Sequence, residues 1–132
     1  MLNKFPFKFQ WPGSGATRLR GNAAEDAALA HLRAQGLRLV ERNYRTPGRG
    51  GGEIDLILRE PDGTLVFAEV RARADASRGG AAASVDAAKQ RRIVLAARHY
   101  LLRRRHPPPC RFDVVAIDGE RIEWIRGAFD AV

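Results

Sequence analysis

Two acidic residues, Asp55 and Glu69, have a spacing that could support metal-dependent chemistry. They flank Pro-Asp-Gly at residues 61–63, and a three-residue loop with glycine in the left-handed position pairs Glu60 with Thr64 across a hairpin. Counting back from that pair places Asp55 directly opposite Glu69. Adjacent carboxylates repel each other unless they share a proton or a cation. Oxygen ligands with no nearby histidine or cysteine favour Mg²⁺ or Mn²⁺, so we expect one of these ions here.

The same register gives the hairpin two different faces. Glu53 lies opposite Arg71 on the acidic face. The other face is apolar and is expected to pack against a helix; it consists of Ile54, Leu56, Leu58, Val66, Ala68 and Val70. The alternative interpretation is that Asp55 and Glu69 are ordinary surface acids near Arg71 and Arg73.

The elements that position these residues follow from hydrophobic periodicity. A helical pattern over residues 24–34 places Glu25 on the apolar arc and Asp26 outside it, and a carboxylate on that arc needs a partner. We then expect strands at residues 37–45, 53–58 and 65–71, a Gly- and Ala-rich loop at 74–83, a helix at 84–105, and strands at 111–117 and 121–125. This order, αβββαββ, predicts an α/β domain.

The second helix is strongly basic. Lys89 lies near the centre of its apolar arc, where it either reaches over the carboxylates or extends along the edge of the core to solvent. The arginines have few acids among them, which is typical of contacts with phosphate groups. They are Arg91, Arg92, Arg98, Arg103, Arg104 and Arg105.

Composition limits the class of protein. The chain has 132 residues, 45% of them hydrophobic, which is enough for one domain with a core. Its net charge of +8 attracts polyanions or an anionic membrane surface. No apolar run has the length of a membrane span or the features of a signal peptide, and the single cysteine, Cys110, fits a reducing compartment. We therefore expect a cytoplasmic protein with no membrane partner.

Residues 1–20 differ in composition from residues 21–132, which we interpret as a single domain. In this N-terminal arm, four aromatic residues, namely Phe5, Phe7, Phe9 and Trp11, alternate with Lys4, Lys8 and polar residues. A period of two would let the arm add to a sheet edge, which offers a route to a homodimer, or let it stack on unpaired bases. The alternative is a disordered tail.

Several blocks of the sequence resemble the YraN family of small bacterial proteins, over about residues 20–128. The blocks are residues 21–32, 42–45, 52–57 and 66–73, the helical set Lys89, Arg92, Ile93, Ala97, Tyr100 and Leu101, and residues 111–114. The fold of that family is similar to Holliday-junction resolvases and other PD-(D/E)XK nucleases. The resemblance therefore implies a restriction-endonuclease-like core, with a mixed sheet flanked by helices. Carried over by position, Glu25, Asp55 and Glu69 match the family's acidic set.

One position departs from the family pattern. Where the family usually has lysine two residues after the second acid, this chain has Arg71. In a nuclease that lysine helps to orient or deprotonate the attacking water. Arginine keeps the positive charge, but with a pKa above about 12 it cannot act as a general base. Lys89 is the candidate replacement.

The preferred hypothesis is a metal-dependent endonuclease or a resolvase-like DNA-processing protein. Asp55, Glu69 and the backbone carbonyl of Val70 would hold Mg²⁺ or Mn²⁺ with Glu25 nearby, and Lys89 or Arg71 would add positive charge. The basic helix and Arg73 would contact the DNA backbone. The alternatives are a nucleic-acid-binding module that kept the fold without turnover, and a protein-interaction subunit that uses the aromatic arm.

Overall fold

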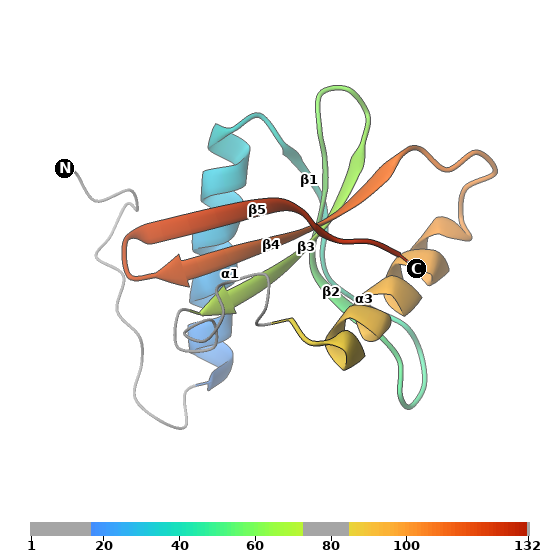
Figure 1. Cartoon of the computed structure of the whole chain (residues 1–132), viewed down its shortest axis with the longest axis horizontal. Helices are drawn as coiled ribbons and strands as arrows, with labels where there is room; N and C mark the ends of the chain where they lie inside the picture. Colours follow the sequence, from blue (N-terminus) through green and yellow to red (C-terminus); the bar gives the residue numbers. More distant parts are fainter. Residues whose placement is uncertain (1–16, 73–84, 132) are drawn as a thin grey trace.

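The computed structural model of the chain describes residues 17–72 and 85–131, with side chains from residue 22 onward (Figure 1). These ranges contain two helices and five strands in the predicted order αβββαββ. The elements are α1 (Thr17–Ala34), β1 (Arg38–Arg45), β2 (Glu53–Arg59), β3 (Leu65–Ala72), α3 (Ala87–Leu101), β4 (Cys110–Asp118) and β5 (Arg121–Phe129). No helix of the described ranges is long and apolar enough to cross a membrane.

The strands form one mixed sheet in the order β1-β2-β3-β4-β5. Neighbouring strands are antiparallel except for β3 and β4, which are parallel. Parallel neighbours need a long crossover connection, and the segment that contains α3 supplies it. The α/β class and the mixed sheet are therefore as expected.

The β2–β3 hairpin has the predicted register. Leu56 pairs with Ala68 and Leu58 with Val66. At the turn, the Glu60 N–H donates to the Thr64 carbonyl at 2.9 Å, and Gly63 has the left-handed φ of 95° that the loop requires. Because the turn is local, its chemistry specifies the pairing of both strands.

A helix covers each face of the sheet (Figure 1). The α1 side buries Ala24, Ala27, Ala28, Leu29 and Leu32 against Leu56, Leu58, Val66 and Ala68. The α3 side buries Ile93, Ala96, Ala97 and Tyr100 against Ile57, Leu65, Phe67 and Phe112. Ile54, expected with the first group, packs on the α3 side beside its cross-strand partner Tyr44. Because both faces are covered, an acidic side chain in the middle of β2 or β3 loses most of its contact with water.

Helix boundaries differ from the sequence expectation at three points. Helix α1 begins at Thr17, so residues 17–20, assigned above to the arm, are helical. Helix α3 begins after Asp86, whose carboxylate accepts the Lys89 backbone N–H at 2.8 Å. It ends at Leu101, ahead of the prolines at 107–109, so Arg103 to Arg105 lie beyond it. The rest of the arm and the predicted loop at 74–83 lie outside the described residues.

Candidate functional site

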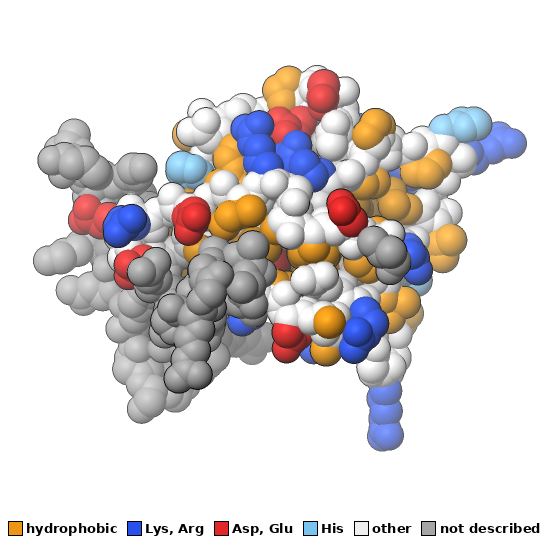
Figure 2. Space-filling model, in the orientation of Figure 1, with side chains coloured by type: hydrophobic (Ala, Val, Ile, Leu, Met, Phe, Trp, Pro, Cys, Tyr) orange, Lys and Arg blue, Asp and Glu red, His pale blue; other side chains and the backbone are white. Residues whose placement is uncertain are grey.

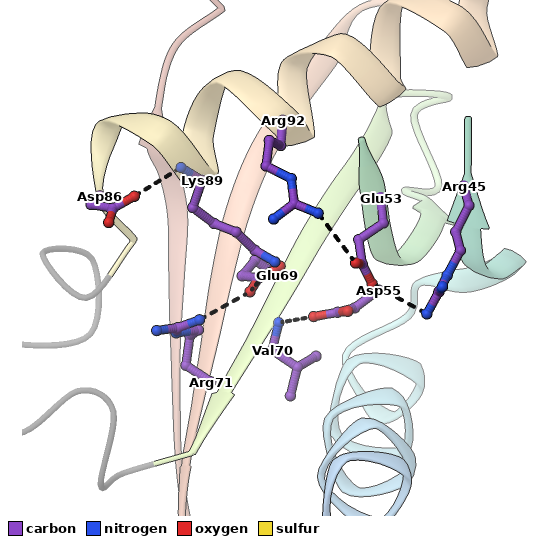
Figure 3. Close-up of polar contacts among 9 residues, drawn as sticks. All are labelled: Arg45, Glu53, Asp55, Glu69, Val70, Arg71, Asp86, Lys89 and Arg92. Carbon is purple, nitrogen blue, oxygen red and sulfur yellow. Dashed lines mark hydrogen bonds and ion pairs between the residues drawn. The ribbon is translucent and has the colours of Figure 1, made fainter. Parts of the chain in front are cut away.

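Asp55 and Glu69 lie side by side on β2 and β3, one residue beyond the paired Leu56 and Ala68 of the hairpin (Figure 3). The Val70 backbone N–H donates to Asp55 Oδ2 at 2.8 Å. Glu69 is only 3% exposed, which is unusual for a carboxylate. The interpretation as ordinary surface acids is therefore wrong for Glu69, and Asp55 beside it is half-buried.

The two acids have perturbed proton affinities. Burial, and then the charge of Glu69, raise the pKa of Asp55 to about 8, while the hydrogen bond from Val70 acts in the opposite direction. Burial also raises the pKa of Glu69, although the Lys89 charge opposes that shift. A side-chain hydrogen bond between the two carboxyl groups raises the pKa of Asp55 and lowers that of Glu69. When no metal ion is bound, this pair holds a proton at neutral pH.

Two cationic side chains contact the Asp55–Glu69 pair, both at the carboxylate of Glu69. Lys89 Nζ lies 3.7 Å from Glu69 Oε2, and Arg71 Nη1 lies 3.4 Å from the same oxygen (Figure 3). Lys89 extends from the first turn of α3 down toward β3, so it reaches over the carboxylates. Arg71 belongs to the same strand as Glu69, two residues later and on the same face.

Glu25 contributes a third acid from α1. Its carboxylate lies 3.3 Å from Arg42 Nη2, and Arg42 Nη1 also bonds Asp26 Oδ1 at 2.7 Å. Burial and then the charge of Asp55 raise the pKa of Glu25, while the hydrogen bond with Arg42 opposes this. Glu25 is therefore close enough to Asp55 for that charge to raise its pKa, but its carboxylate is paired with Arg42. Within the described ranges, no three acidic, His or Cys side chains are grouped so as to hold a metal ion.

The described residues include two buried acids, and they differ in how their oxygens are satisfied. Asp113 is fully buried and accepts hydrogen bonds from Arg111, Trp124 and the Gly127 backbone at 2.8 to 2.9 Å. Glu69 Oε1 is buried and accepts no hydrogen bond from the described residues. A buried oxygen of this kind is costly unless a ligand satisfies it. Asp113 is thus explained by structure alone, whereas Asp55 and Glu69 fit a hard divalent cation.

Glu53 extends the charged cluster along β2. Its carboxylate lies 3.8 Å from both Arg45 Nη2 and Arg92 Nη2 (Figure 3). Arg92 and Lys89 are one turn apart on α3, so they flank the acids on the same side of the helix. Arg45 and Arg42 were not identified as site residues from the sequence, because their acidic partners lie on other elements, Glu53 on β2 and Glu25 on α1.

The glycines before β2 hold α3 close to the site. The Gly52 N–H donates to Thr46 Oγ1 at 2.8 Å. A Cβ atom on Gly52 would lie 1.9 Å from the Arg92 carbonyl oxygen and 2.9 Å from the Ala96 amide nitrogen. The stretch at residues 46–52 therefore ends in a packed contact that only glycine allows.

We expect Gly52→Ala to lower the free energy of unfolding by about 2 to 3 kcal/mol, because the added methyl group overlaps the α3 backbone. Chemical denaturation measures the change. Arg49→Ala is the matched control, since Arg49 is exposed in the same segment before β2. Equal stability of the two variants would contradict the close packing.

The arginines predicted to bind nucleic acid do not form one surface. Arg91 is two residues from Lys89 and points to nearly the opposite side of α3, because each residue turns a helix by about 100°. Beyond the helix, Arg103 stacks on the rings of Tyr44 and Tyr100, and Arg104 on Tyr100. Arg105 is exposed, and Arg73 lies outside the described residues. On the face in Figure 2, basic side chains form separate groups with acids between them.

Comparison with known proteins relates the site to a set of homologues. The model of the uncharacterised protein family UPF0102 matches residues 24–117, a range that contains Glu25, Asp55, Glu69 and Lys89. A UPF0102 protein of Acidovorax sp. (strain JS42) is 71% identical over 115 residues, or 87% of each chain. Another, from Paracidovorax citrulli (strain AAC00-1), is 67% identical over 124 residues, which cover 91% of this chain and 92% of the relative.

Proposed function

This chain belongs to the uncharacterised protein family UPF0102, also called YraN, and we propose that it is a divalent-metal-dependent phosphodiesterase acting on nucleic acid. The observation that carries the proposal is the adjacent pair of Asp55 and Glu69, in which Glu69 is buried and has an oxygen that no described residue satisfies. A pair of this kind on adjacent strands, facing two cations, has the charge distribution needed to bind first a metal ion and then a phosphate.

The proposal includes a PD-(D/E)XK, or restriction-endonuclease-like, core. Support comes from α1 packed on a mixed sheet whose adjacent strands carry the two acids. The third acid, Glu25, projects from that helix near Asp55. This is the arrangement that the sequence resemblance implies.

Asp55 and Glu69, with the main-chain carbonyl of Val70, would hold Mg²⁺ or Mn²⁺. When bound, the ion would make water more acidic and reduce the negative charge on a phosphate group. For the ion to bind, Asp55 must lose the proton that it retains up to about pH 8. Occupancy at a given metal concentration should therefore increase with pH up to that value.

The cations around the acids would act on the phosphate. Lys89 and Arg71 project into the space beside Glu69, where they would stabilise the charge that develops on the phosphate oxygens. Only Lys89 has the chemistry to exchange a proton, because the guanidinium of Arg71 stays charged. Arg92, on the same side of α3, would contact a neighbouring phosphate of the nucleic-acid backbone.

A second candidate function is nucleic-acid binding without turnover. Arg71, in the place where the family pattern has lysine, favours it, because this position then lacks a group that can transfer a proton. The two candidates share the fold and the metal site and differ only in cleavage.

We expect Asp55→Asn to abolish both calorimetric Mn²⁺ binding and Mn²⁺-dependent cleavage of single-stranded or branched DNA. The amide keeps the shape of the side chain but removes one of the two charges that attract the ion. Glu120→Gln is the control, because it removes an exposed carboxylate from the β4–β5 turn and should leave both activities intact.

Equal Mn²⁺ affinity in the wild-type protein and in Asp55→Asn would contradict the site. Mn²⁺ binding by the wild-type protein without cleavage of any DNA structure would instead favour the second candidate.

A further inference from the structure

A groove of about 620 Å³ runs along the side of α3 that faces away from the acidic pair. Its helical wall includes Arg91, Val94, Leu95 and Arg98, and its other wall includes Asp130, just after β5. Figure 1 shows the C-terminal end of the chain beside α3. These helix positions recur every three or four residues and so form one continuous stripe.

The groove is distinct from the proposed phosphodiesterase site. Lys89 and Arg92 lie on the side of α3 that faces Glu69 and Glu53. Arg91, two residues after Lys89, lies on the other side. A nucleic acid bound at the acidic pair would therefore not enter the groove by following the same helix face.

The groove combines an apolar wall with two guanidinium groups, those of Arg91 and Arg98. Leu95 is 47% exposed, which makes it one of the few large exposed apolar side chains among the described residues. Arg91 and Arg98 have no hydrogen-bond or ion-pair partner in the part of the chain that the structure describes. By contrast, Arg92 pairs with Glu53 and Arg103 with Glu41. An apolar side chain between two available guanidinium groups is complementary to a partner that carries both acids and an apolar group.

Asp130 favours a peptide over a nucleic-acid backbone as the partner that binds in the groove. A carboxylate repels a phosphodiester, and the phosphate oxygens are only acceptors. A peptide offers N–H donors to the same carboxylate while its acidic side chains meet the arginines. The groove volume also falls in the range that holds a few side chains.

We propose that this groove binds a short acidic peptide segment of a partner protein. One apolar side chain of the segment packs on Val94 and Leu95, and acidic side chains on either side of it pair with Arg91 and Arg98. Its backbone N–H groups donate to Asp130. The site is independent of the proposed phosphodiesterase activity and would recruit the protein to its partner.

The test is selection of a phage-displayed random peptide library on the full-length protein. Peptides are counter-selected on Arg91→Glu/Arg98→Glu and then measured by fluorescence anisotropy. We expect enriched peptides to carry acids around a Leu, Ile or Phe, and to lose at least about tenfold in affinity in the double variant. Arg33→Glu/Arg38→Glu is the matched control, because it reverses two exposed charges on α1 and β1 and should leave peptide affinity intact.

Enrichment of neutral or basic peptides, or equal affinity in both double variants, would overturn the proposal. It would also be overturned if no peptide were enriched while Arg91→Glu/Arg98→Glu weakened DNA binding more than the control, because the groove would then contact nucleic acid. Self-association that the same variant abolished would identify a second copy as the occupant, again against the proposal. Because none of these readouts uses metal or cleavage, failure here leaves the phosphodiesterase proposal unaffected.

Discussion

Lys89→Ala is expected to lower Mn²⁺-dependent DNA cleavage about 100-fold or more and to leave DNA affinity nearly unchanged. Lys89 is the one side chain beside Glu69, among the described residues, that combines positive charge with an exchangeable proton. A correctly placed acid or base contributes about 10²–10⁴-fold to a rate. Single-turnover cleavage measures the chemical step, and fluorescence anisotropy without metal measures affinity.

Two further variants separate the roles of charge and proton transfer. Lys89→Arg keeps the charge and should recover only part of the rate, whereas Arg71→Lys adds a second exchangeable group beside Glu69 and should raise it. Arg33→Ala, which removes an exposed cation from α1, is the control for net charge. Full activity of Lys89→Ala would remove Lys89 from the mechanism. Absence of cleavage in both the wild-type protein and Arg71→Lys would support binding without turnover.

In the metal-free protein, Asp55→Asn is expected to raise the free energy of unfolding at pH 8 by about 2 to 4 kcal/mol more than it does at pH 4. The folded protein retains the Asp55 proton up to about pH 8, whereas the unfolded chain releases it near 3.8. The contribution of this group to folding is therefore complete below the unfolded pKa and is lost as the pH rises through the folded value. Asparagine has no such proton, so the variant escapes the loss. Urea denaturation of both proteins from pH 4 to 9 measures the difference.

Divalent cation provides an internal check on this pH dependence. Millimolar Mn²⁺ should stabilise the wild-type protein most at pH 8, where the ion takes the place of the proton, and should have little effect on Asp55→Asn. Glu120→Gln should follow the wild-type curve, since its carboxylate is exposed in a turn. Parallel stability curves for wild type and Asp55→Asn across this range would show that Asp55 is not the proton-binding group.

The hairpin that carries the acids could be predicted from sequence because its information is local. Gly63 adopts the left-handed conformation that the three-residue loop needs, and Leu56 pairs with Ala68 as the turn dictates. Helical periodicity likewise placed Glu25 inside and Asp26 outside on α1. Element order, the pairing within this hairpin and the face of each acid all depend on patterns within a few residues.

Tertiary structure alone decided the properties that make this pair a candidate site. The burial of Glu69 and the proton affinity of Asp55 depend on α3 covering that face of the sheet. The same packing brings Lys89 to Glu69 and places Arg91 in a groove beside Asp130. These are contacts between residues far apart in the chain, and their energies depend on distance and on excluded water, which periodicity does not record. The sequence therefore specified which residues face the same side, and packing determined which of them share a proton, a cation or a partner.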